Sequence, residues 1–259
     1  AWFYKFASIF SSEMTVTYAA IIFPVFMFAL TAIAFFLFAR KIFYRQSVLK
    51  RNAIALISTA FFVLIPSLLP RTIAGIPEKE SAAFFFMFLA FYFFLEALTS
   101  KNMKKAIIFG VLSGITTGLM ALVWGGVIFV FLTISASMIL AFILGKMQKK
   151  ELIVHGLWLI FSFITMMPFS TRYSLINLIN SPSTGLAIAS FGAIFLSIFI
   201  IKIEKLEKYR KKLKLPKQLF GLIVSGLLII LLAGIVLGPG FLINNITFLT
   251  SITKNLYTI

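Results

Sequence analysis

Two glutamates and an arginine in one short polar segment are the residues of this sequence best suited to chemistry. The segment PRTIAGIPEKESA, residues 70–82, contains Arg71, Glu78 and Glu80. Acidic residues are scarce elsewhere, since the 259-residue chain has seven of them and all seven are glutamate. Two carboxylates held close together repel each other, so one must take a proton or a cation must lie between them.

The local backbone conformation decides whether the two glutamate side chains point to the same side. In an extended segment, side chains two residues apart point to the same side, whereas in a helix they diverge. Gly75 and Pro77 favour a turn or an extended segment, because glycine allows a tight bend and proline disfavours helix at the residue before it. The sequence therefore predicts that Glu78 and Glu80 lie on the same side of an extended loop.

A divalent cation is a suitable partner for such a pair. Carboxylate oxygens are the ligands that hard cations prefer, which makes Mn²⁺ or Mg²⁺ the expected cofactor. Two carboxylates fill only part of a coordination shell, and an acid-x-acid pair also occurs in ordinary solvated loops. Both interpretations stay open on the residues alone.

Composition places the chain in a membrane. Hydrophobic residues make up 61% of it, 32 residues are phenylalanine, and the mean hydropathy is +1.07, whereas soluble domains are nearer to half apolar. The absence of cysteine excludes a disulfide framework and a thiolate metal site. The net charge of +17 comes from basic residues in short clusters between apolar runs, so we expect no nucleic acid as a partner.

Apolar windows long enough to cross about 30 Å of hydrocarbon recur along the whole chain. No repeat, linker or change of composition marks a second domain. We therefore predict an all-α fold, a polytopic membrane helix bundle of about eight spans that forms a single domain over residues 1–259. The predicted spans are 17–39, 52–69, 81–98, 106–122, 126–145, 152–169, 186–203 and 220–237.

Basic residues fall unevenly on the loops between these spans. Alternate loops, at 40–51, 101–105, 146–150 and 202–217, hold 19 of the 24 Lys and Arg residues, which predicts that this face is cytoplasmic. Segment 70–82 joins two spans on the opposite face. Its chemistry is therefore expected on the extracytoplasmic side of a multi-pass protein of the cell membrane. The run 202–217 predicts a helical connector that lies on anionic membrane lipids.

The segment RTIAGIPEKE, residues 71–80, follows an apolar span that ends IPSLLP and precedes a phenylalanine-rich span. In order and spacing it resembles the catalytic subunit of oligosaccharyltransferase, most closely the archaeal single-subunit form, a dolichyl-phosphooligosaccharide-protein glycotransferase. Two further stretches are similar to that family: LVWGG, which contains Trp124, Gly125 and Gly126, and LGPGFL at 237–242. The resemblance implies the membrane domain of a GT-C glycosyltransferase.

The resemblance also implies an activity and its substrates. The activity would be metal-dependent protein N-glycosylation, in which an oligosaccharide moves from a polyprenyl (dolichyl) phosphate or diphosphate carrier to Asn in an Asn-x-Ser/Thr sequon of an acceptor polypeptide. Glu78 would ligate the cation, Glu80 would ligate it directly or through another ligand, and Arg71 would orient a carboxylate or a lipid phosphate. This chain has Glu where the family more often has Asp, and Pro77 in place of an aromatic residue.

Three motifs of that family are absent from residues 1–259. Its first acidic motif would lie upstream of residue 1, whereas its Thr/Ser-x-x-Glu-type external motif and its Trp-Trp-Asp-Tyr-Gly acceptor-binding motif would lie downstream of residue 259. We therefore expect the chain to be a transmembrane fragment that lacks an N-terminal span, a first external loop and a C-terminal soluble domain, and that is inactive by itself.

Three other residues have less specific surroundings. Arg172, on the outer side near Pro168, is predicted either to face a lipid phosphate or to be an ordinary interface anchor. Glu96, near the cytoplasmic end of its span, is expected to reach toward Lys101. His155 is expected to be a hydrogen-bonded histidine at the membrane interface.

Two alternatives remain open at this stage. One is another membrane glycosyltransferase that uses a polyprenyl phosphate, which would usually carry its acids in the first external loop. The other is a non-enzymatic transporter or channel, in which the polar loops are connectors. Against a transporter, the spans contain almost no ionisable residue that could line a path.

Overall fold

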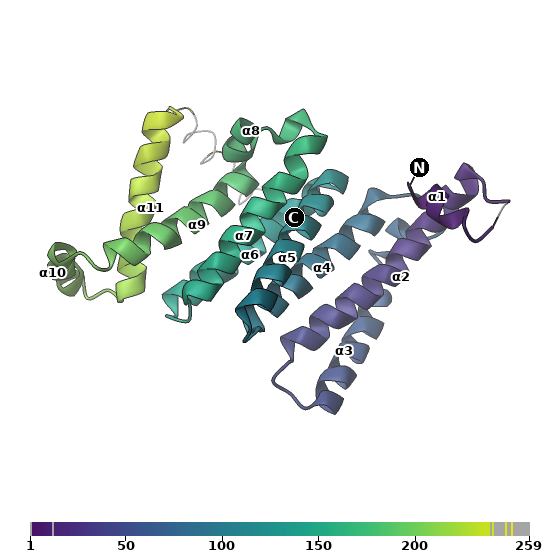
Figure 1. Ribbon diagram of the computed structural model, residues 1–259, viewed down its shortest axis with the longest axis horizontal. Coiled ribbons are helices and arrows are strands. Elements are labelled where there is room, and N and C mark those ends of the chain that lie inside the picture. The colour runs from purple at the N-terminus through teal and green to yellow at the C-terminus, as the bar shows by residue number, and fades with distance from the viewer. Residues whose placement is uncertain (1, 12, 239, 241–246, 248–249, 251–259) are drawn as a thin grey trace.

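The computed structural model describes residues 2–11, 13–238, 240, 247 and 250, and within them the chain is helical throughout (Figure 1). The predicted polytopic helical bundle is confirmed. Helices suit a hydrocarbon environment because each one satisfies its own backbone hydrogen bonds. Seven segments of the described chain are long and apolar enough to span a membrane: α2 (Val16–Ile42), α4 (Lys79–Thr99), α5 (Met103–Val123), α6 (Ile128–Ile143) with the preceding 3-10 turn η2 (Gly125–Val127), α7 (Lys149–Met166) with η3 (Met167–Phe169), α9 (Pro182–Ile200) and α11 (Lys217–Val236).

The predicted span at 52–69 is wrong in its extent. The helix found there, α3 (Val48–Val63), has 16 residues and covers about 24 Å, less than the roughly 30 Å of the hydrocarbon core. Pro66 and Pro70 explain the early end, because the residue before a proline disfavours helical backbone. The chain continues as a 3-10 turn, η1 (Leu69–Arg71). The described part therefore contains seven spanning helices instead of eight, although α3 still returns the chain alongside α2 (Figure 1).

The core of the bundle is the contact of α5 with α4 and α7. Glycines on α5 let the backbone of α7 approach closely, which is a common way for membrane helices to associate. A Cβ at Gly114 would lie 2.6 Å from the carbonyl oxygen of Trp158, and one at Gly118 would lie 2.5 Å from Cβ of Thr165. Trp158 is fully buried, and its indole N–H donates to Oγ1 of Thr117 at 3.0 Å. Next to it, Oγ of Ser113 on α5 donates to the carbonyl oxygen of Ala90 on α4 at 2.8 Å, which ties α5 to the helix that carries the candidate site.

The loops separate onto the two ends of the bundle. The connections from α2 to α3, from α4 to α5, from α6 to α7 and from α9 to α11 lie at one end (Figure 1). They coincide with the four predicted basic loops, and we call this the basic end. The short helices α1 (Trp2–Ala7) and α8 (Leu175–Asn180), together with η1 and the start of α4, lie at the other end, which we call the Arg71 end.

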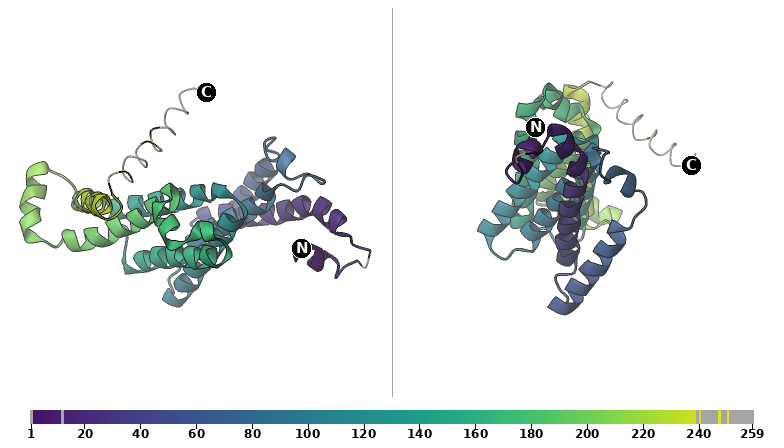
Figure 2. Two further views of the ribbon diagram at one scale, coloured as in Figure 1. Left: turned by 90° about the horizontal axis from the view of Figure 1, so that it is seen from above. Right: turned by 90° about the vertical axis from the view of Figure 1, so that its right-hand side faces the viewer.

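The predicted helix in the run 202–217 is confirmed as α10 (Glu204–Leu213). Its polar face carries an ion pair, in which Arg210 Nη2 contacts Glu207 Oε1 at 2.5 Å. Lys214 ends the helix with a left-handed backbone, at φ 52°. Figure 2 shows α10 projecting from the basic end, beyond the main body of the bundle.

Candidate active site

The loop that carries Arg71 is tied to α2 at its turn. Within the loop, Oγ1 of Thr72 donates to the carbonyl oxygen of Leu68 at 2.9 Å. Gly75 has φ +90°, a backbone conformation that residues with a Cβ atom rarely adopt. This conformation lets the N–H of Gly75 donate to the carbonyl oxygen of Ile21 on α2 at 3.0 Å. The loop is therefore held on the N-terminal part of α2 by a backbone hydrogen bond.

The start of α4 is fixed by hydrogen bonds as well. Glu78 is the N-cap residue, with extended backbone at φ −75° and ψ 138°, and its side chain accepts no capping hydrogen bond. Oγ of Ser81 donates to the carbonyl oxygen of Glu78 at 2.7 Å. Oγ1 of Thr31 on α2 donates to the carbonyl oxygen of Ser81 at 3.4 Å. These contacts hold the first turn of α4 against α2.

The prediction that Glu78 and Glu80 share an extended loop is wrong. The helix begins at Lys79, so Glu80 lies in its first turn while Glu78 precedes it. Pro77 does not prevent this, because a proline before the N-cap takes no part in the helical hydrogen bonds. The apolar run after Glu80 is long enough to favour helix from Lys79 onward. The two carboxylates therefore have different surroundings.

Glu80 forms an ion pair with Arg71 in which the acid is buried and the base is not. Nη1 of Arg71 lies 3.0 Å from Oε1 of Glu80, and the Arg71 side chain is 48% exposed while that of Glu80 is 8% exposed. The second carboxylate oxygen, Oε2, is buried and has no hydrogen-bond partner. A carboxylate in the first turn is also favoured by the positive end of the helix dipole. Glu80 thus keeps one acceptor that nothing in the described chain satisfies.

Glu78 faces a different space. Its half-buried side chain lies at a cavity of about 430 Å³ between α1, α2 and the start of α4. The walls are mostly apolar, and Glu80 is not one of the lining residues. The cavity is lined by Phe3, Tyr4, Val16, Ala19, Ala20, Phe23, Pro77, Glu78 and Lys79. Glu78 therefore presents a carboxylate beside an apolar cavity.

The Trp124 turn packs against the same part of α4. Phe84 lies one helical turn after Glu80, on the same face of α4, and its ring centroid is 5.7 Å from that of Trp124. Gly126 is required by this turn, since a Cβ there would lie 2.1 Å from the Trp124 ring. The two stretches that carry the resemblance, 71–80 and 122–126, are thereby brought to one end of the bundle.

Arg172 also lies at the Arg71 end, but apart from the two glutamates. It is exposed in the turn η4 (Thr171–Tyr173), with its guanidinium 5.9 Å from the centroid of the Tyr173 ring. The hydroxyl of Tyr173 donates to the carbonyl oxygen of Ala121 at 2.6 Å, which ties η4 to the end of α5. Arg172 and Gly125 line one small cavity of about 90 Å³. Within the described chain, Arg172 forms no ion pair with Glu78 or Glu80.

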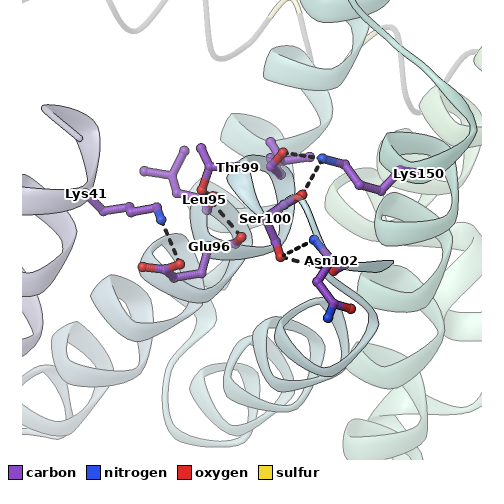
Figure 3. A network of polar contacts seen from close by, with 8 residues as sticks. Lys41, Leu95, Glu96, Thr99, Ser100, Asn102 and Lys150 are labelled. Carbon is purple, nitrogen blue, oxygen red and sulfur yellow. Dashed lines mark hydrogen bonds and ion pairs between the residues drawn. The ribbon is translucent and has the colours of Figure 1, made fainter. Parts of the chain in front are cut away.

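Two expectations about single residues are wrong. Glu96 forms its ion pair with Lys41 of α2 instead of Lys101, with Nζ of Lys41 2.7 Å from Oε2 of Glu96 (Figure 3). His155 is fully buried on α7, and neither ring nitrogen has a hydrogen-bond partner. Its ring stacks on Trp158 instead, at 5.6 Å between centroids. Sequence spacing could not reveal either contact, since each partner comes from how the helices pack.

The residues that could hold a cation are few. No group of three or more His, Cys, Asp or Glu side chains is close enough to hold a metal ion anywhere in residues 2–11 and 13–238. In the Arg71 loop and the first turn of α4, the Glu78 side chain accepts no capping hydrogen bond and Oε2 of Glu80 has no hydrogen-bond partner. Residues 239, 241 and 242 of the LGPGFL segment lie outside the described residues.

A family model matches almost the whole chain. It is described as oligosaccharyl transferase STT3, N-terminal, and the match covers residues 1–253. No curated protein matches the chain. The matched range includes the Arg71 loop, the start of α4, the Trp124 turn and Arg172.

Proposed function

The chain belongs to the STT3 family of oligosaccharyl transferases, and from this premise we propose that residues 71–80 form the part of its active site that meets the phosphate of the glycan carrier. The family are membrane glycosyltransferases of protein N-glycosylation, which act on a lipid-linked oligosaccharide and an acceptor protein. We propose that the carrier is a polyprenyl (dolichyl) phosphate or diphosphate and the acceptor an Asn-x-Ser/Thr sequon. This assignment leaves no reason to favour a transporter, a channel or another polyprenyl-phosphate-dependent glycosyltransferase.

The observation that supports this most strongly is the unequal exposure of the Arg71 and Glu80 pair. Arg71 has five N–H donors in a planar fork, and Glu80 engages the fork from the buried side. Because the Arg71 side chain is 48% exposed, its guanidinium has further donors for phosphate oxygens, which arginine favours in a two-point geometry. Glu80 is then a positioning residue for Arg71, because it fixes the orientation of the guanidinium.

Two carboxylates at this end carry acceptors of the kind that a divalent cation prefers. Oε2 of Glu80 is a buried carboxylate oxygen without a donor, and the Glu78 side chain accepts no capping hydrogen bond. We propose that Glu78 and Glu80 would hold Mn²⁺ or Mg²⁺, with water and parts of the protein outside residues 1–259 completing the shell. A bound cation would neutralise the negative charge that develops on the departing phosphate.

The acceptor nitrogen needs help from the protein, because the lone pair of a carboxamide is delocalised into its carbonyl group. In the transfer, the anomeric carbon exchanges its bond to phosphate oxygen for a bond to this nitrogen. The departing carrier phosphate keeps the electron pair of the broken bond, and the nitrogen releases one proton to that phosphate or to water. We propose that Glu78 accepts a hydrogen bond from the N–H of the acceptor amide, weakening that delocalisation. Its half-buried position strengthens such a bond relative to water.

The apolar cavity beside Glu78 gives the carrier lipid a place at the site. Its walls include Phe3, Val16 and Phe23, which suit an isoprenoid chain. The carboxylate lies at this cavity, so a phosphate at the head of the chain would lie near the acids. We propose Arg172 as a second contact for the lipid phosphate, because it is exposed in η4, which packs on the end of α5.

The test is a glycan-transfer assay on the full-length protein with Glu78→Gln, at several Mn²⁺ concentrations. We expect transfer to fall about 100-fold, and the Mn²⁺ concentration for half-maximal activity to rise. Glu13→Gln is the matched control, since it removes an exposed glutamate in the connection between α1 and α2, and it should keep wild-type activity. Wild-type activity in Glu78→Gln would remove Glu78 from the mechanism.

Sidedness has its own test, because the chain contains no cysteine. Ile76 is 42% exposed in the Arg71 loop, and Lys101 is exposed at the basic end. We expect a membrane-impermeant maleimide added to intact cells to label Ile76→Cys and to leave Lys101→Cys unlabelled. The reverse labelling pattern would place the candidate site on the cytoplasmic side.

A further inference from the structure

A second cavity with polar walls lies at the basic end, far from the candidate active site. It has a volume of about 180 Å³ and is formed where the last turn of α2, the following turn, the first turn of α3 and the second half of α4 meet. Its polar lining consists of Arg40, Lys41, Tyr44, Arg51, Tyr92 and Glu96. The residues come from three separate helices, so packing of the bundle builds this cavity.

The cations of this cavity outnumber its acids. Lys41 pairs with Glu96 at 2.7 Å (Figure 3). Nε of Arg40 donates to Oδ1 of Asn52, a neutral acceptor, at 2.8 Å. Nε of Arg51 is buried and has no hydrogen-bond partner. Glu96 is the one acid among the lining residues, so three cations and one carboxylate leave two positive charges uncompensated.

A buried guanidinium nitrogen without an acceptor is unfavourable, because it has lost its hydration without gaining a bond. An anion in the cavity would supply that acceptor and balance the remaining charge. At roughly 30 Å³ per water molecule, the cavity has room for a phosphate group and a few waters. Arginine forks and tyrosine hydroxyls are donors that suit phosphate oxygens.

We propose that this cavity binds the phosphate of an anionic membrane lipid, an interaction that goes beyond the glycan transfer proposed for the opposite end. The helix α3, whose first turn helps to line the cavity, exposes large apolar side chains that would contact acyl chains: Leu49 is 82% exposed, Leu56 60% and Phe61 72%. A soluble phosphate ion has no apolar surface to bury against these side chains. The cytoplasmic leaflet, where the positive-inside rule places the basic end, is also the leaflet that carries anionic headgroups.

The test measures lipid binding to the full-length protein in a neutral detergent, by native mass spectrometry of lipid adducts. Phosphatidic acid is the probe and phosphatidylcholine the neutral reference. We expect Arg51→Gln to weaken phosphatidic acid binding about tenfold. The matched control is Lys50→Gln, which removes the same charge from the neighbouring exposed residue, and it should change the affinity less than about twofold. Equal losses in both variants would mean diffuse attraction and would overturn the site.

Two further measurements distinguish a specific lipid site from misfolding and from a site for soluble phosphate. Glu96→Gln removes the competing carboxylate, so phosphatidic acid should bind severalfold tighter, a gain that misfolding cannot produce. An unchanged or weaker affinity in this variant would count against the proposal. Inorganic phosphate at millimolar concentration should leave the lipid adduct intact. Displacement by inorganic phosphate would overturn the lipid assignment and identify the ligand as soluble phosphate.

Discussion

The helix α4 carries a glutamate near each end, and the two have opposite surroundings. Glu80 and Glu96 lie about 24 Å apart along the helix axis. Glu80 is buried while its partner Arg71 is 48% exposed. At Glu96 both partners are partly exposed, with side-chain exposures of 16% for Lys41 and 23% for Glu96. One end therefore has an unsatisfied carboxylate oxygen, which suits a cation beside the phosphate that Arg71 would bind, whereas the other has cations in excess, which suits an anion alone.

The largest stability effect should come from Arg71→Gln. The change leaves Glu80 buried beside a neutral side chain, and an uncompensated buried carboxylate is costly. We expect a loss of about 2 kcal/mol, or roughly 6 °C in the thermal unfolding midpoint of the detergent-solubilised protein. Glycan transfer should fall as well, because the phosphate donor is lost. A midpoint equal to that of the wild type would show that Glu80 does not depend on Arg71.

Removing the acid of the same pair should cost less. Glu80→Gln leaves Arg71, whose half-exposed side chain remains solvated. We expect about 1 kcal/mol of destabilisation, measured in the same thermal unfolding experiment. A loss larger than that of Arg71→Gln would contradict the unequal burial on which the comparison depends. Transfer activity should still drop, since Arg71 loses the contact that orients it.

At the other end, Lys41→Gln should be milder still. Glu96 is partly exposed, and Arg40 and Arg51 line the same cavity and supply compensating charge. We expect the free energy of unfolding to fall by about 0.5 kcal/mol. This loss should be smaller at high salt, because partly exposed charges are screened. Unfolding midpoints at low and high ionic strength test this. A salt-insensitive loss of stability as large as that of Arg71→Gln would contradict the difference in burial between the Arg71–Glu80 and Lys41–Glu96 pairs.

The ion pair on α10 provides the weakest case. A hydrogen bond from Arg210 lowers the pKa of Glu207, so the stabilisation is present above the ordinary pKa of glutamate and is lost as the pH falls below it. The pair lies on a peripheral helix outside the bundle. Glu207→Gln should therefore shift the unfolding midpoint at pH 7 by less than about 1 °C. A larger shift would mean that α10 contributes to the stability of the bundle.

Hydropathy and charge predicted most of the fold because both act locally. Seven spans, the basic connector and the division of loops between two ends all follow from apolar run length and from the positions of Lys and Arg. The error at 52–69 arose because apolar residues continue past Val63 while Pro66 and Pro70 interrupt the helix. A hydropathy window does not register proline as a break.

The candidate site was only partly predictable. The types and spacing of Arg71, Glu78 and Glu80 identified the segment, yet the backbone between the glutamates was assigned to an extended loop. The pairing of Arg71 with Glu80 depends on the loop being anchored to α2 through Gly75 and Ile21. Likewise, the cavity at Arg51 depends on three helices meeting. Such contacts arise between distant parts of the chain, and no local pattern in one sequence encodes them.

The brevity of α3 has a consequence for the lipids around the protein. Where α3 faces the bilayer, about 24 Å of helix stands beside α2, whose 27 residues extend to about 40 Å. Either the bilayer next to α3 is thinner, or the apolar residues that follow Val63 lie in it as non-helical chain. The mismatch is confined to this flank of the described chain, since each of the other seven membrane segments is long enough to cross the hydrocarbon core.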